Sequence, residues 1–159
     1  MPEVILAIGA HPDDIALMCG GTLARKVLEG ASVHILTIAD GVSSRGGFID
    51  DERLGRIEQS QNAATVMGAK SIINIGFPDN QLDIVPLLSI IKSIEKEVER
   101  WKPTVIYTHH GSDLNIDHRM VSEAVVVACR PASGVKLILF GEVPSATDYQ
   151  LPYNFVPNW

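Results

Sequence analysis

Several common signatures are scarce or missing in this sequence. It contains two cysteines, Cys19 and Cys129, with no CxxC spacing, so we expect two reduced thiols and no disulfide framework. No apolar run reaches the length of about 18 residues that a transmembrane helix needs. The first residues, MPEVILAIGA, place no basic segment before the apolar one, so no secretory signal is predicted. The sequence therefore predicts a cytoplasmic protein.

The sequence also lacks the motifs of three large functional classes. No GxGxxG follows the first apolar run, and no GxxxxGK followed by Ser or Thr occurs, which argues against a nucleotide-binding module. No GxSxG is present, which argues against a serine hydrolase. The formal net charge is -6, whereas a nucleic-acid-binding protein needs a basic face. We therefore expect no nucleic-acid partner.

What the sequence does contain is a regular alternation of strand-like and helix-like segments. Its 159 residues, 46% hydrophobic and 20% charged, suit one soluble domain over residues 1–159. The predicted strands are residues 4–8, 32–39, 71–77, 104–108 and 135–140. The predicted helices are residues 21–28, 51–67, 85–101 and 117–129. This order predicts an α/β fold, a Rossmann-like three-layer α/β/α sandwich with a mostly parallel sheet in the order 3-2-1-4-5.

Two segments fall outside this alternation. Residues 42–50 hold two glycines and two serines, which predicts a loop. Residues 141–159 are rich in proline and aromatic residues and show no periodicity, so we interpret them as the start of a further element.

Two polar clusters follow the first and fourth predicted strands. The first is residues 10–14, Ala-His-Pro-Asp-Asp, and the second is residues 109–118, His-His-Gly-Ser-Asp-Leu-Asn-Ile-Asp-His. The carboxyl ends of parallel strands share one edge of a sheet, and strands one and four flank the point where the strand order reverses. We therefore expect the two clusters to meet, bringing four histidines and four aspartates together.

Metal binding accounts for such crowding. Two imidazoles and one carboxylate suit a divalent cation that keeps open positions for water. The cation would also relieve the repulsion among Asp13, Asp14 and Asp117. Each residue alone has a simpler interpretation, since an aspartate can cap the following helix and a loop histidine can be solvated. The expected convergence of both clusters is what favours a metal site.

The two motifs together resemble those of the LmbE-like, or PIG-L, family of metal-dependent de-N-acetylases. His11-Pro12-Asp13-Asp14 and Asn115-Ile116-Asp117-His118 carry the resemblance, which extends over residues 4–145. It implies a zinc-dependent hydrolase that cleaves a linear amide C–N bond. The acetyl group of an N-acetylglucosamine-type sugar conjugate, a small molecule, would leave as acetate and a free amine. The same ligand set also suits Fe²⁺.

The resemblance implies roles for individual residues. His11, Asp14 and His118 match the metal ligands, and Asp13 matches the general base of the family. Asp117 is a candidate hydrogen-bond partner behind a ligating histidine.

Asn115 stands where many members have a histidine. Its amide could steady an oxyanion but cannot carry a proton. The acid that protonates the leaving amine is therefore either His110 or Asp13. Ile15 and Gln59 stand where members often have glutamate.

Substrate contacts are expected from three further residues. Arg56 matches an arginine of the family, whereas Arg45 and Asp79 are expected in loops at the same sheet edge; all three could equally be solvated polar residues. The chain is shorter than most members, so a non-catalytic metal- or sugar-binding relative is the alternative prediction. The sequence leaves homo-oligomerisation open.

Overall fold

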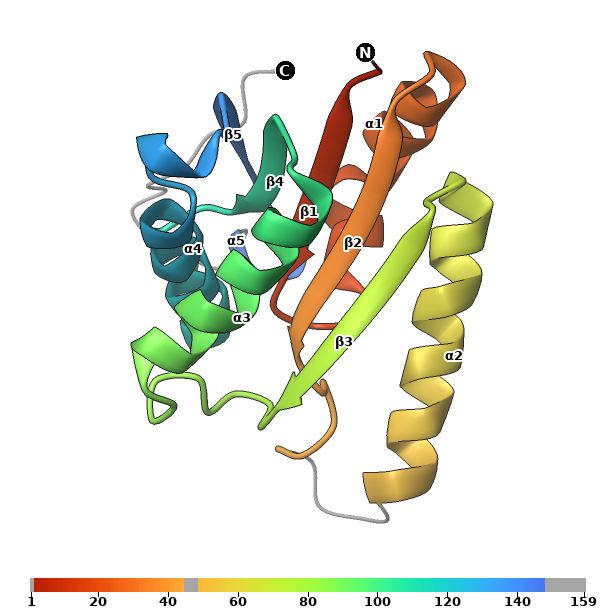
Figure 1. Cartoon of the computed structure of the whole chain (residues 1–159). Helices are drawn as coiled ribbons and strands as arrows, with labels where there is room; N and C mark the ends of the chain where they lie inside the picture. The colour runs from red at the N-terminus through yellow and green to blue at the C-terminus, as the bar shows by residue number, and fades with distance from the viewer. Residues whose placement is uncertain (1, 45–48, 148–159) are drawn as a thin grey trace.

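The computed structural model describes residues 2–44 and 49–147. Five parallel strands form one sheet in the order β3-β2-β1-β4-β5 (Figure 1), which confirms the predicted fold. The strands are β1 (Val4–Gly9), β2 (Ser32–Ala39), β3 (Ser71–Phe77), β4 (Val105–His109) and β5 (Leu137–Gly141).

Helices cover both faces of this sheet (Figure 1). They are α1 (Asp14–Leu28), α2 (Ile49–Met67), α3 (Leu87–Trp101), α4 (Ile116–Ala128) and the short α5 (Pro144–Thr147), with a 3-10 turn over Pro131–Ser133. Alternation along the central strands explains the layers, because successive side chains of a strand point to opposite faces. Ile5 packs with α1 and α2, whereas Leu6 packs with α3 and α4.

Burial is greatest in the middle of the sheet. All eight residues of β2 are buried, and so are the last five of the six residues of β1. A parallel sheet covered on both faces needs such continuous apolar strands. The carboxyl ends of β1 and β4 lie side by side, with Ile8 opposite Thr108. The loops that leave these two strands therefore start next to each other.

The first helix differs from its prediction. It begins at Asp14 rather than at residue 21, and Cys19 inside it has non-helical backbone angles (φ -147, ψ 16) that mark a kink. Gly20 and Gly21 suggested a helix start, but Gly20 instead allows a close helix contact. A Cβ on Gly20 would lie 3.2 Å from the Met67 sulfur of α2. The earlier start places Asp14 in the first turn of α1.

Three further predictions can be compared with the described residues. Cys19 and Cys129 are free thiols. In the described part of the chain, no helix combines the length and apolar character that crossing a membrane requires. The predicted loop over residues 42–50 is two residues too long at its end, because α2 already begins at Ile49.

Candidate functional site

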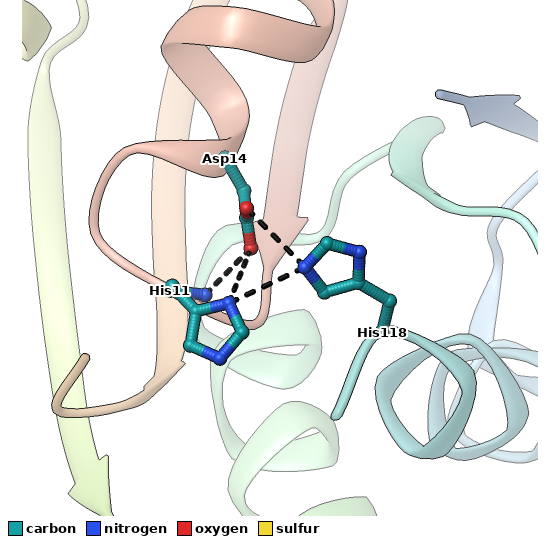
Figure 2. A group of neighbouring side chains, drawn as sticks. All are labelled: His11, Asp14 and His118. Atoms are coloured by element: carbon teal, nitrogen blue, oxygen red, sulfur yellow. Dashed lines mark hydrogen bonds and ion pairs between the residues drawn. The ribbon is translucent and has the colours of Figure 1, made fainter. Parts of the chain in front are cut away.

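Three side chains from the two polar clusters meet at the carboxyl edge of the sheet (Figure 2). The His11 Nδ1 atom lies 3.3 Å from Asp14 Oδ2 and 3.3 Å from His118 Nε2. The same His118 Nε2 lies 3.4 Å from Asp14 Oδ1. His11 comes from the turn between β1 and α1, Asp14 is the first residue of α1, and His118 comes from the first turn of α4. We call these residues the His-Asp-His cluster.

Carboxylates behind the cluster hold both imidazoles in place. His118 Nδ1 pairs with Asp113 Oδ2 at 2.9 Å, so its Nε2 faces inward. His11 Nε2 lies 3.2 Å from Asp117 Oδ2 and 3.1 Å from Asp79 Oδ1, so its Nδ1 faces inward. Such outer partners fix the tautomer and direction of a metal-binding histidine.

Asp117 is itself firmly anchored. It is fully buried, and it accepts hydrogen bonds from the backbone N–H groups of Asn80 (2.7 Å) and Leu82 (3.0 Å). These bonds tie the loop after β3 to the His-Asp-His cluster. Asp117 therefore holds His11 from behind, and it does not cap α4; its role behind a metal ligand stays a prediction.

His109 lies beneath the His-Asp-His cluster and was not among the predicted site residues. Its Nε2 accepts a hydrogen bond from the Ala10 N–H at 2.9 Å and lies 3.1 Å from Asp14 Oδ2. Its ring stacks on His118 with centroids 3.9 Å apart. Burial lowers the pKa of His109 despite the Asp14 carboxylate, so the ring is neutral. It supports the floor of the site by packing.

The electrostatics of the His-Asp-His cluster favour a positive charge at its centre. Burial works to lower the pKa of His11, but hydrogen bonds with Asp117, Asp14 and Asp79 outweigh it and raise that pKa to about 12. Burial also works to lower the pKa of His118, but hydrogen bonds with Asp113 and Asp14 outweigh it and raise that pKa to about 9. Inward-facing nitrogen and oxygen atoms with surplus negative charge around them are a donor set that fits a divalent cation.

A cavity of about 230 Å³ opens over the His-Asp-His cluster, and Asp13 and Arg56 belong to its wall. Asp13 is the N-cap residue of α1, but its carboxylate makes no capping hydrogen bond. Instead it is about half exposed and pairs with Arg56 Nη1 at 3.2 Å. The carboxylate thus stands at the cavity beside, and not within, the His-Asp-His cluster.

Asn115 lines the same cavity and also begins α4. Its Oδ1 accepts hydrogen bonds from the backbone N–H groups of Asp117 (2.8 Å) and His118 (3.4 Å). This is the usual geometry of an N-cap asparagine. Its Nδ2 donates to Asn80 Oδ1 at 3.3 Å. The cap orients the helix turn that carries His118.

The remaining predicted site residues are Asp79, His110 and Arg45. Asp79 is 3% exposed and belongs to the cavity wall, and its carboxylate is bonded to His11 and Ser44, so it holds His11 from behind; its contact with a sugar stays a prediction. Burial works to raise its pKa, but the bonds from His11 and Ser44 lower it to about 2. His110 lines a separate hollow with Arg119. Arg45 lies outside the described residues.

The comparisons with known proteins point to one family. Residues 6–129 match the family described as GlcNAc-PI de-N-acetylase, PIG-L. The chain is 36% identical over 146 residues to the uncharacterized deacetylase YaiS of Escherichia coli, covering 89% of this chain and 74% of that one. It is 28% identical over 105 residues to the diacetylchitobiose deacetylase of Thermococcus kodakarensis, covering 64% of this chain and 39% of that one.

The chain is also similar to a protein of known structure. The conserved protein TT1542 of Thermus thermophilus superposes with a TM-score of 0.73 at 30% identity, covering 89% of this chain and 66% of that one. The present chain thus spans about three quarters of the length of YaiS and less than two thirds of the Thermococcus enzyme.

Proposed function

The chain belongs to the GlcNAc-PI de-N-acetylase (PIG-L) family, and from that premise we propose that it is a metal-dependent hydrolase that removes the acetyl group from an N-acetylated sugar. The observation that carries the proposal is the convergence of His11, Asp14 and His118 beneath an open cavity. The Thermococcus relative is named for the deacetylation of an N-acetylated sugar.

The His-Asp-His cluster would hold the cation, with zinc as the proposed ion and Fe²⁺ as the alternative. A divalent cation at such a site supplies a Lewis acid that polarises an acyl oxygen and makes a nearby water more acidic. The chain would support the cation from behind with Asp113 at His118 and with Asp79 and Asp117 at His11, because these carboxylates contact the outer nitrogens of the two imidazoles. All three partners are carboxylates, which increase the basicity of the imidazoles they bind.

Asp13 would accept the proton of the attacking water. Its carboxylate is exposed to the cavity and makes no cap bond, so it is available for proton transfer. Arg56 Nη1, 3.2 Å away, fixes the direction of that carboxylate. After collapse of the tetrahedral intermediate, Asp13 would return the proton to the leaving amine. His110 is less well placed for this step, because it lines a different hollow.

Asn115 would donate an N–H to the acyl oxygen as negative charge develops on it. Its place on the cavity wall supports this role. The substrate would be a small sugar conjugate whose N-acetylhexosamine ring enters the cavity, with the charged group of Arg56 close to the ring hydroxyls. Arg45 remains a predicted sugar contact.

The test is acetate release from a panel of N-acetylhexosamine compounds. The protein would be loaded with Zn²⁺, or with Fe²⁺ under anaerobic conditions, and assayed with and without a chelator. We expect release that the chelator removes and that added metal restores, with His118→Ala as the inactive control. If the metal-loaded protein releases acetate from none of the compounds, the non-catalytic metal- or sugar-binding alternative is the better description.

A further inference from the structure

Asn80 occupies an unusual backbone position beside the cavity. It lies in the turn after β3 with φ 51, and across residues 2–44 and 49–147 it shares a positive φ with just one other non-glycine residue, Lys102. Asparagine tolerates this left-handed region better than most side chains, whereas glycine occupies it without strain. Asn80 is exposed and contributes to the cavity wall.

The contacts of Asn80 join three loops that come from different parts of the chain. Its backbone N–H donates to Asp117 Oδ2 at 2.7 Å. Its Nδ2 donates to Asp79 Oδ1 at 3.3 Å and to Ser44 Oγ at 3.4 Å. Its Oδ1 accepts from Asn115 Nδ2 at 3.3 Å. The side chain thus links the loops after β2 and β3 to the start of α4.

The bond to Asn115 matters because an amide group is planar. The Asn115 oxygen is held by two backbone N–H groups of α4. One of its two side-chain N–H groups is held by Asn80. With the oxygen and one N–H fixed, the direction of the second N–H is fixed as well.

We infer that Asn80 is a positioning residue for the reaction, because it holds the Asn115 amide so that the second N–H points to the acyl oxygen of the bound substrate. This inference rests on the proposed function. Both side chains are neutral amides, so the pair gains and loses no proton across the working pH range. A preorganised donor of this kind is worth more than one that must reorient during the reaction.

The test is a double-mutant cycle between Asn80→Gly and Asn115→Ser. Glycine suits the positive φ of residue 80, so Asn80→Gly removes the side chain while the turn can keep its backbone. Serine is also a good N-cap residue, so Asn115→Ser removes the amide donor while α4 keeps a cap. Circular dichroism and the melting temperature check that both variants fold, and metal analysis checks that both load.

We expect Asn80→Gly to lower kcat by about 10-fold, the scale of one well-placed hydrogen bond, with KM changed less than about twofold. In the Asn115→Ser background the same substitution should have almost no further effect. Unchanged kcat in Asn80→Gly would overturn the inference. So would additive effects in the cycle with a raised KM, since Asn80 would then contact the sugar independently.

A second measurement decides the inference without turnover. In ¹⁵N spectra of the metal-loaded protein, the side-chain NH₂ signals of Asn115, identified by their loss in Asn115→Ser, should shift and exchange faster with solvent in Asn80→Gly. Unchanged signals would overturn the inference even if the wild-type protein released no acetate. Changed signals together with absent acetate release would uphold the amide pair and contradict the proposed function.

Discussion

Histidines at opposite ends of the same sheet have opposite surroundings. At the carboxyl end, His11 and His118 are enclosed by aspartates. At the amino end, His34 stacks on Trp101 with ring centroids 3.7 Å apart and shares a 2.8 Å hydrogen bond with Ser71 Oγ. His34 is 5% exposed, which lies between the 3% of His118 and the 12% of the His11 side chain. Burial alone therefore does not distinguish the two ends.

The charges around each imidazole make the difference. Burial lowers the pKa of His34, and the nearby cations Lys70 and Arg100 lower it further. At the other end, carboxylates reverse the effect of burial and raise the pKa of His11 and His118. One end of the sheet therefore attracts an added cation and the other repels it. A histidine becomes a candidate ligand through its neighbours and not through its burial.

The largest expected effect tests this contrast directly. His118→Ala removes an inward-facing nitrogen, so it should abolish stoichiometric zinc binding and reduce turnover by more than the roughly 10–100-fold typical of an outer partner. The matched variant His34→Gln should keep bound zinc and turnover near the wild-type values. Metal content by mass spectrometry and acetate release measure both. Full zinc occupancy in His118→Ala would remove that residue from the ligand set.

Asp13→Asn should have the next largest effect. The amide cannot accept a proton, so turnover should fall by about 10² or more, while the bound metal remains because Asp13 stands outside the His-Asp-His cluster. The control is Asp83→Asn, the same chemical change at an exposed aspartate. Turnover and metal content are measured together. If zinc-loaded Asp13→Asn works at the wild-type rate, another group is the base.

Asp79→Asn should have a smaller effect that separates two roles. If Asp79 holds His11 in place, the substitution should weaken zinc affinity by about 10–100-fold and leave KM nearly unchanged at saturating zinc. A competition assay with a coloured zinc chelator measures the affinity. A raised KM with unchanged zinc affinity would instead restore the original prediction that Asp79 contacts the sugar.

Much of the fold and of the site could be predicted because both depend on patterns that extend over many residues of the sequence. The strand order follows from the strand–helix alternation, and the approach of His11 to His118 follows from two polar clusters placed after strands one and four. Both rest on topology, which a single sequence can reveal. That the three residues are metal ligands stays a prediction, which zinc analysis will test.

What could not be predicted depended on local geometry of one or two residues. His109 and His110 are adjacent, and which of them faces the site depends on where β4 ends. The strand was predicted to end at residue 108, whereas it continues to His109, so alternation directs that ring beneath the His-Asp-His cluster. The role inferred for Asn80 was even harder to predict from the sequence, because it depends on the positive φ of this residue and on a hydrogen-bond partner 35 residues away.

The smallest expected effect concerns the amino end of the sheet and the dependence of stability on pH. Because the pKa of His34 is lower in the folded state than its ordinary value of 6.5, the unfolded chain binds more protons between those two values. The stability contributed by neutral His34 is therefore complete above pH 6.5 and declines as the pH falls toward the folded pKa.

The variant His34→Gln serves as the reference because glutamine cannot titrate. The free energy of unfolding of the wild type, relative to that of the variant, should decrease between pH 7.5 and pH 5.5 by on the order of 1 kcal/mol or less. Urea unfolding of both proteins at the two pH values, each without metal, measures the difference. An unchanged difference would mean that neither burial nor Lys70 and Arg100 lower the pKa of His34, and the contrast between the two ends of the sheet would then rest on the carboxylates alone.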